Sequence, residues 1–187
     1  MNIAVIGNQG DLAVALTTSL QQDHLVTNYS KNEFNFLNKQ SVIDLAERIS
    51  SADVIICCAG VFSEHDSWDS YTINTVAPLF LLDRLTQLSS KAHFIMVGSH
   101  AAMWTSWPGI NFARLVYNTS KQSIQSIVVG LAQSGQSSLT LTVINPSSFQ
   151  SKMNNYQGYP IDQVVESVHS IITSSVPLLV VEYNNFK

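Results

Sequence analysis

Short apolar runs recur along the chain and are separated by longer stretches of mixed apolar and polar residues. The runs have the length of β-strands and occupy residues 3–6, 24–29, 53–59, 93–98, 139–144 and 177–183. Their nearly continuous hydrophobicity is typical of strands buried on both faces, as in a parallel sheet covered by helices. A weaker run, FNFL at 34–37, would bring the number of strands to seven.

The stretches between the runs predict helices. They cover residues 11–21, 41–50, 74–88, 117–133 and 162–173. In the fourth stretch, apolar side chains recur at i, i+3, i+4 and i+7 from Ile124 to Leu131, which predicts one apolar face. Strands and helices alternate throughout. The pattern therefore predicts an α/β fold, a single doubly wound domain over residues 1–187, with a mainly parallel seven-stranded sheet and helices on both faces.

Composition narrows the function classes. The 187 residues are 45% hydrophobic but only 12% charged, and a weakly charged surface often accompanies oligomers. A net charge of -4 leaves no basic surface for nucleic acid. No apolar run suits a signal peptide or a membrane span, so we expect a cytoplasmic protein without a membrane partner. Cys57 and Cys58 are adjacent and are expected to be reduced. No metal-binding residues are predicted.

A glycine-rich stretch, GNQGDLA at 7–13, follows the first predicted strand and opens the first predicted helix. Glycines let the backbone approach a pyrophosphate, whose charge is stabilised by the N–H groups at the start of a helix. The stretch therefore predicts a dinucleotide-binding turn, and the alternative is an ordinary structural turn. The candidate cofactor-binding residues are Gly7, Asn8, Gln9, Gly10, Asp11 and Leu12.

The second predicted strand ends in NYSK at 28–31. It lacks the acidic residue with which an NAD site usually holds the ribose 2′-hydroxyl. Ser30 and Lys31 can instead bind a 2′-phosphate, which favours NADP over NAD. The alternative is a polar loop that begins with a solvated lysine.

Taken together with motifs further along, the sequence resembles the short-chain dehydrogenase/reductase family over nearly its whole length. The glycine-rich turn, Asn74, Ser99 and Tyr117 with Lys121 stand where the family has the same residue types, in the same order. Three other segments lie at family positions but differ in residues. These are Asn35-Phe36 where the family has an Asp-hydrophobic pair that reads adenine, CCAG at 57–60 where it has Asn-Asn-Ala-Gly, and NPSS at 145–148 where it has a Pro-Gly turn. The resemblance implies a Rossmann fold and a nicotinamide cofactor. It adds Asn35, Phe36, Ala59, Gly60, Tyr117, Lys121, Pro146 and Ser147 to the expected cofactor contacts.

The resemblance also implies catalytic roles. A carbonyl that accepts hydride needs a proton, and Tyr117 would supply it as acid/base. Lys121, one helical turn away, would lower the pKa of that phenol and hold the nicotinamide ribose. Ser99 would polarise the carbonyl, and Asn74 would anchor a water relay. Alternatively, Ser99 caps a backbone group and Asn74 is the N-cap of the following helix, while His100 is expected to be incidental.

Two length differences separate the chain from the family pattern. Residues 104–116 lengthen the gap before Tyr117 and predict an extended loop, whose Trp104, Trp107 and Phe112 either line a substrate pocket or pack in a dimer interface. The segment between Pro146 and the last helix is short. A shallow site would follow, which implies a small substrate, a lid from a neighbouring subunit, or no turnover.

Some substitutions also fall at expected cofactor contacts. Asn35, Cys57 and Ser147 replace more typical family residues, and weaker dinucleotide affinity is a consequence to test. The two cysteines are expected to pack as small hydrophobes.

From these features the sequence predicts an NADP(H)-dependent oxidoreductase, a carbonyl reductase or alcohol dehydrogenase that acts on a small-molecule carbonyl or alcohol. A homodimer or homotetramer built on the helices that begin at Asn74 and Tyr117 is expected. The alternative is a non-catalytic NADP(H)-binding sensor or interaction protein on the same fold.

Overall fold

A computed structural model describes residues 1–7, 9–104, 108–174 and 180–182. Its six strands are all parallel and form one sheet in the order β2-β1-β3-β4-β5-β6. The strands are β1 (Asn2–Ile6), β2 (Leu25–Tyr29), β3 (Val54–Cys57), β4 (His93–Val97), β5 (Thr140–Asn145) and β6 (Val180–Glu182). The prediction of an α/β fold with a parallel sheet is confirmed. Of the predicted strand 177–183, residues 177–179 and 183 lie outside the described residues.

The prediction of a seventh strand at 34–37 is wrong, because these residues form turns and coil. Phe34 and Phe36 are both buried, with ring centroids 4.8 Å apart, so the run is apolar for reasons of packing. Between them, Asn35 Oδ1 accepts a hydrogen bond from the Leu37 N–H at 2.9 Å. A side chain that binds its own backbone in this way competes with a strand ladder. As a result β2 is an edge strand.

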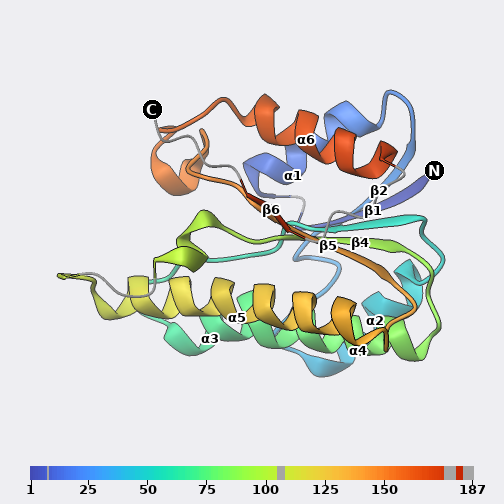
Figure 1. The fold of residues 1–187 in the computed structure, drawn as a ribbon, viewed down its shortest axis with the longest axis horizontal. Coiled ribbons are helices and arrows are strands. Elements are labelled where there is room, and N and C mark those ends of the chain that lie inside the picture. Colours follow the sequence, from blue (N-terminus) through green and yellow to red (C-terminus); the bar gives the residue numbers. More distant parts are fainter. Residues whose placement is uncertain (8, 105–107, 175–179, 183–187) are drawn as a thin grey trace.

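Helices cover both faces of the sheet (Figure 1). On one face lie α1 (Asp11–Leu20) and α6 (Ile161–Thr173), and on the other lie α2 (Lys39–Ile49), α4 (Ala77–Gln87) and α5 (Phe112–Ser134). Shorter turns connect them: α3 (Ser67–Tyr71), the π-helical turn η1 (Thr72–Val76), and the 3₁₀ turns η2 (His100–Met103) and η3 (Lys152–Asn154). No helix in the described part of the chain is both long and apolar enough to cross a membrane.

Two helical stretches begin five or more residues before their predicted start, at Phe112 and at Ser67. The helix expected at 117 begins at Phe112, because Asn111 Oδ1 accepts the Arg114 N–H at 2.8 Å and caps the first turn. Residues 112–116 of the predicted extended loop 104–116 are therefore helical, and residues 105–107 lie outside the described residues. The helix expected at 74 is preceded by α3, and Asp66 caps that element. Asn74 lies inside η1, so its alternative role as an N-cap is wrong.

Alternate strand residues feed two apolar layers, as a pleated sheet requires. In β1, Ile3 and Val5 pack with α1 and α6, whereas Ala4 and Ile6 pack with the helices on the other face. From β1 the chain first continues to β2 on one side and then crosses back to β3 on the other side of β1, so the direction of strand addition reverses there. In such sheets the crevice at the carboxyl ends of the strands is the usual place for a ligand.

Two glycines provide a matched stability test. A Cβ on Gly98, just after β4, would lie 2.1 Å from Asn145 Oδ1, whereas a Cβ on Gly130 in α5 would meet nothing within 4 Å. We expect Gly98→Ala to lower the free energy of unfolding by about 1–3 kcal/mol through overpacking. Gly130→Ala should raise it by about 0.5–1 kcal/mol, because alanine favours the helix. Urea denaturation measures both, and equal changes would contradict the described packing.

Candidate active site

The turn between β1 and α1 has the geometry of an anion site. Gly7 has φ +96°, and a Cβ there would lie 2.8 Å from the Ala59 backbone nitrogen, so only glycine fits this close approach. Gly10 is the N-cap of α1, and no described side chain caps this end. The first N–H groups of a helix lack partners within the helix and favour negative charge. Asn8, a predicted contact in this turn, lies outside the described residues.

A cavity of about 910 Å³ opens beside this turn, at the carboxyl edge of the sheet. Its volume lies in the upper part of the range usual for ligand sites. The structure brings ten predicted site residues to its lining: Gln9, Gly10, Asp11, Leu12, Gly60, Ser99, Tyr117, Lys121, Pro146 and Ser147. These residues come from the loops after four different strands, from the first turn of α1 and from α5, so only the folded chain assembles them.

Tyr117 and Lys121 lie on the same face of α5, as their spacing predicts. Lys121 is only 4% exposed, and its Nζ lies 5.9 Å from the centroid of the Tyr117 ring. Nζ donates to the Val97 carbonyl at 3.3 Å, and no carboxylate of the described residues pairs with it. An ammonium has three donors, and burying it is costly unless they are used. The site therefore suits a ligand that offers hydroxyl oxygens to Lys121.

Asn74 is fully buried and links three segments. Its Oδ1 accepts the Val61 N–H at 2.9 Å, and its Nδ2 donates to the Val61 carbonyl at 2.8 Å and to Ser120 Oγ at 3.1 Å. A Cβ on Gly60 would lie 2.9 Å from Lys121 Nζ and 3.3 Å from Asn74 Oδ1. Because Gly60 has no side chain, the Asn74 amide and the Lys121 ammonium can both lie against its Cα. π-Helical turns such as η1 are frequent at functional sites.

The hydroxyl of Ser99 has a structural role. Its Oγ accepts the Ala101 N–H at 3.1 Å and caps η2, while its backbone N–H donates to Asn145 Oδ1 at 3.1 Å. A hydroxyl that accepts one bond keeps its own proton to donate, so capping does not exclude a bond to a substrate oxygen. His100 also lines the cavity, and its Nδ1 accepts a hydrogen bond from Trp104 Nε1 at 3.2 Å.

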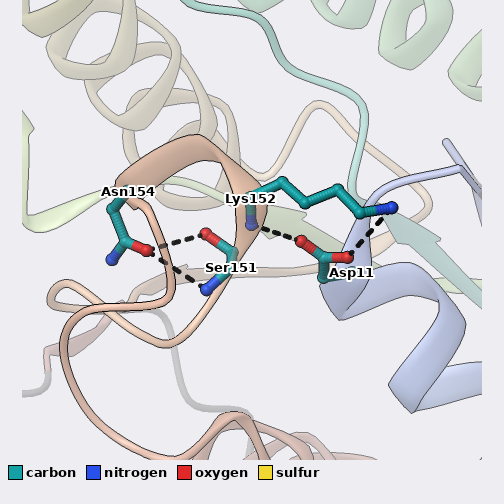
Figure 2. Close-up of polar contacts among 4 residues, drawn as sticks. All are labelled: Asp11, Ser151, Lys152 and Asn154. Carbon is teal, nitrogen blue, oxygen red and sulfur yellow. Dashed lines mark hydrogen bonds and ion pairs between the residues drawn. The ribbon is translucent and has the colours of Figure 1, made fainter.

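One wall of the cavity is formed by residues 147–157, which we call the strap. Figure 2 shows how it is held: Asp11 Oδ2 accepts the Lys152 N–H at 2.6 Å, and Asp11 Oδ1 lies 3.9 Å from Lys152 Nζ. Within the strap, Asn154 Oδ1 accepts from the Ser151 N–H at 3.1 Å and from its hydroxyl at 3.3 Å. The short segment after β5 is thus folded and tied to the start of α1.

The end of β2 holds charges that sequence reasoning missed. Glu33 Oε2 accepts the Ser30 N–H at 2.8 Å, and Glu33 Oε1 lies 3.8 Å from Arg48 on α2. The hydrogen bonds from Ser30 hold the pKa of Glu33 below its usual value, with a smaller contribution from Arg48. Lys31 is exposed next to this group. Arg48 could not be assigned here from sequence, because only the packing of α2 brings it to Tyr29 and Glu33.

The expected adenine contacts lie outside the cavity lining. Asn35 is exposed, whereas Phe36 is 6% exposed and packs in the core, so contact with adenine stays a prediction.

Burial raises the pKa of Cys57 to about 11 and also raises the pKa of Cys58, so both thiols are neutral at pH 7.

Aromatic and polar side chains near Tyr117 complete the cavity. The Phe62 ring stands edge-on to Tyr117 at 5.7 Å, and the Arg114 guanidinium lies 4.8 Å from the Phe62 centroid. Asn118 Nδ2 donates to the Trp104 carbonyl. Trp104 lines the cavity, as one sequence interpretation held. Phe112 is 71% exposed and is not part of the cavity lining, and Trp107 lies outside the described residues.

No family model matches the chain, and no curated relative matches it. Solved structures share its fold. A 3-alpha-hydroxysteroid dehydrogenase from Pseudomonas sp. B-0831, solved with NADH, has TM-score 0.80 and 18% identity over 97% of this chain and 95% of its own. A short chain dehydrogenase from Burkholderia cenocepacia J2315, solved with NADP, has TM-score 0.79 and 16% identity over 97% and 95%. Serine dehydrogenase from Escherichia coli has TM-score 0.73 and 14% identity over 98% and 97%.

The contact between Asp11 and Lys152 predicts how firmly the strap is held. Asp11→Ala removes the acceptor of the Lys152 N–H and the ion pair, so the free energy of unfolding should fall by about 1 kcal/mol. Asp11→Asn keeps an acceptor and should lose less. Hydrogen exchange at residues 147–157 should quicken in the alanine variant more than in the asparagine variant. Unchanged exchange in both variants would contradict the tether.

Proposed function

On the fold of the short-chain dehydrogenase/reductases, which this chain has, we propose that the protein is an NADP(H)-dependent oxidoreductase that interconverts a small carbonyl compound and its alcohol. The observation that carries this proposal is the position of Tyr117 and buried Lys121 in the same cavity as the open N-terminus of α1. The cavity volume and the cradle at Gly7 fit a dinucleotide.

The residues of this chain divide the work of binding and proton transfer. The first N–H groups of α1 hold the pyrophosphate, and Lys121 holds the ribose hydroxyls. A bound NADPH supplies the hydride for the carbonyl carbon. Tyr117 gives its proton to the carbonyl oxygen, and Lys121 favours the phenolate that remains. Ser99 donates its free hydroxyl proton to the same oxygen, which stabilises the charge that develops there.

Asn74 supports the site through positioning, and we propose that it also anchors the water through which Lys121 exchanges protons with solvent. Its amide holds the Val61 backbone and Ser120, next to Gly60 and Lys121. The buried amide keeps the loop after β3 at a fixed distance from α5.

We place the 2′-phosphate of the cofactor at the end of β2. Ser30 and the exposed Lys31 support this choice, and Arg48 adds a second positive charge nearby. Glu33 also lies here, but Arg48 offsets part of its charge. A 2′-phosphate gains from a cation that a plain ribose does not need.

A homo-oligomer and a cytoplasmic location stay predictions. Support for an oligomer comes from large apolar side chains that are exposed near the start of α5 and on the elements beside it: Trp68, Val76 and Phe112 are 80%, 50% and 71% exposed. Trp68 and Val76 border an apolar groove with Val116. Light scattering at micromolar concentration tests this proposal, and the mass of a monomer would defeat it.

The catalytic proposal predicts that removal of the Tyr117 hydroxyl lowers turnover. Tyr117→Phe keeps the ring against Phe62 but removes the proton, so turnover of small ketones, aldehydes and quinones should fall by a factor of about 10² or more. NADPH binding should stay within about twofold of the original value, because the phenol is not needed for affinity. Tyr71→Phe, which removes a hydroxyl bonded to Ser123 away from the cavity, is the control.

Equal turnover in the Tyr117→Phe variant and the unmodified protein would remove the catalytic role of Tyr117. Tight NADPH binding without turnover of any carbonyl would favour the alternative function, a cofactor-binding sensor or interaction protein.

The cofactor preference rests on Lys31. Lys31→Ala should weaken NADPH binding about tenfold, the equivalent of about 1.4 kcal/mol, and leave NADH binding nearly unchanged. Lys91→Ala, at an exposed lysine before β4, serves as the control. Fluorescence titrations with both nucleotides measure the effect, and equal losses for NADH and NADPH would defeat the assignment.

A further inference from the structure

The charged side chains of the cavity do not balance. Asp11, Arg114, Lys121 and Lys152 line it. Asp11 pairs with Lys152, whereas neither Arg114 nor Lys121 forms an ion pair with any carboxylate in the described part of the chain. The cavity therefore carries surplus positive charge in a protein of net charge -4. Surplus charge of one sign in a cleft raises the local concentration of ligands with the opposite sign.

Arg114 is placed next to the proposed catalytic pair. It precedes Tyr117 by three residues and Lys121 by seven, so the three side chains share one face of α5. Its guanidinium lies over the Phe62 ring at 4.8 Å, and that ring is edge-on to Tyr117 at 5.7 Å. Stacking on an aromatic ring holds a guanidinium while its N–H groups remain able to bind an anion.

The phosphates of the cofactor do not account for this charge. The expected pyrophosphate site is the N-terminus of α1, and α1 and α5 cover opposite faces of the sheet (Figure 1). The expected 2′-phosphate site lies at the end of β2, and Arg48 rather than Arg114 lies beside it. Lys121 is assigned to the ribose. Arg114 is then the cation that remains for the substrate.

A second polar group beside Tyr117 also lacks a partner. Asn118, one turn after Arg114, is fully buried and lines the cavity. Its Nδ2 donates to the Trp104 carbonyl, but its Oδ1 has no hydrogen-bond partner among the described residues. A buried acceptor without a partner is costly unless a ligand or water donates to it. The region around Tyr117 therefore suits a polar ligand better than an apolar one.

We propose that Arg114 is a specificity-determining residue that binds a carboxylate of the substrate, and that the substrate is a short oxo acid, with the hydroxy acid as its reduced form. This inference rests on the proposed function. A guanidinium binds a carboxylate through two parallel hydrogen bonds. Residues three apart on a helix have Cβ atoms about 5–6 Å apart, so the carboxylate lies only a few bonds from the carbonyl at Tyr117.

The reaction on such a substrate is balanced. Hydride from NADPH forms the new C–H bond at the carbonyl carbon, the C=O π bond breaks, and Tyr117 gives the proton that forms the O–H bond. NADPH becomes NADP⁺, solvent returns one proton to Tyr117, and the carboxylate is unchanged. Arg114 takes no part in the transfer and acts only by holding the substrate.

The test compares acids with their neutral esters: acetoacetate with methyl acetoacetate, and levulinate with methyl levulinate. With NADPH, kcat/KM should be at least tenfold higher for each acid than for its ester. Arg114→Leu should lower that ratio at least tenfold, mainly through KM, and Arg114→Lys should lower it less because the bidentate geometry is lost but the charge remains. Arg84→Leu, on α4 and outside the cavity lining, should keep the ratio.

A binding measurement separates this inference from the proposed function. Calorimetry with butyrate and with butyramide, in the presence of NADP⁺, needs no turnover. Butyrate should bind at least tenfold more tightly than butyramide, and Arg114→Leu should remove the difference. If that holds while no carbonyl is reduced, Arg114 binds carboxylate but the reductase proposal fails. If acid and ester lose rate equally in Arg114→Leu, or butyrate and butyramide bind alike, the carboxylate role is overturned.

Discussion

The buried ammonium of Lys121 is the constraint around which the rest of the site is arranged. Among the residues that the structure describes, only the Val97 carbonyl accepts a hydrogen bond from it, so much of its desolvation cost is left uncompensated. Gly60 leaves the space it needs, and Asn74 holds the loop that carries that glycine. A ligand that supplies oxygen atoms to Nζ relieves this cost. A ligand that binds only the folded state stabilises that state. Binding of such a ligand at Lys121 should therefore raise the stability of the fold.

The sheet and half of the site could be predicted because their signals are local. Continuous apolar runs indicate strands buried on both faces, and the structure has a strand in each of the six strong runs. The glycine-rich turn and the spacing of Tyr117 and Lys121 also depend on a few adjacent residues. FNFL misled the prediction, since Phe34 and Phe36 are buried within a turn. Apolar alternation alone does not distinguish that arrangement from a strand.

The remaining site features depend on contacts between distant segments. Arg48 reaches Glu33 only because α2 packs beside the end of β2, and Arg114 reaches Phe62 only because α5 passes the loop after β3. The early start of α5 also depended on one residue, the N-cap Asn111, which lies in a stretch that has no helical apolar period. Caps and long-range ion pairs leave little trace in a single sequence.

The strap compensates for the brevity of the segment after β5. Asn155, Tyr156 and Gly158 adopt positive φ, so the chain turns tightly enough to return to α6 within a few residues. Its first turn is closed by Ser151 and Asn154. A short segment can therefore still serve as a cavity wall, provided that it is fastened to α1.

The edge position of β2 has a consequence for the behaviour of the molecule in concentrated solution. An unpaired sheet edge offers N–H and C=O groups to other chains and can seed aggregation. Here that edge is only five residues long, and the charged side chains of Asp23 and Lys31 stand just beyond its two ends. A strand this short, with a charge near each end, offers few hydrogen-bonding groups to a strand of another molecule. The exposed edge at β2 is therefore not expected to promote aggregation.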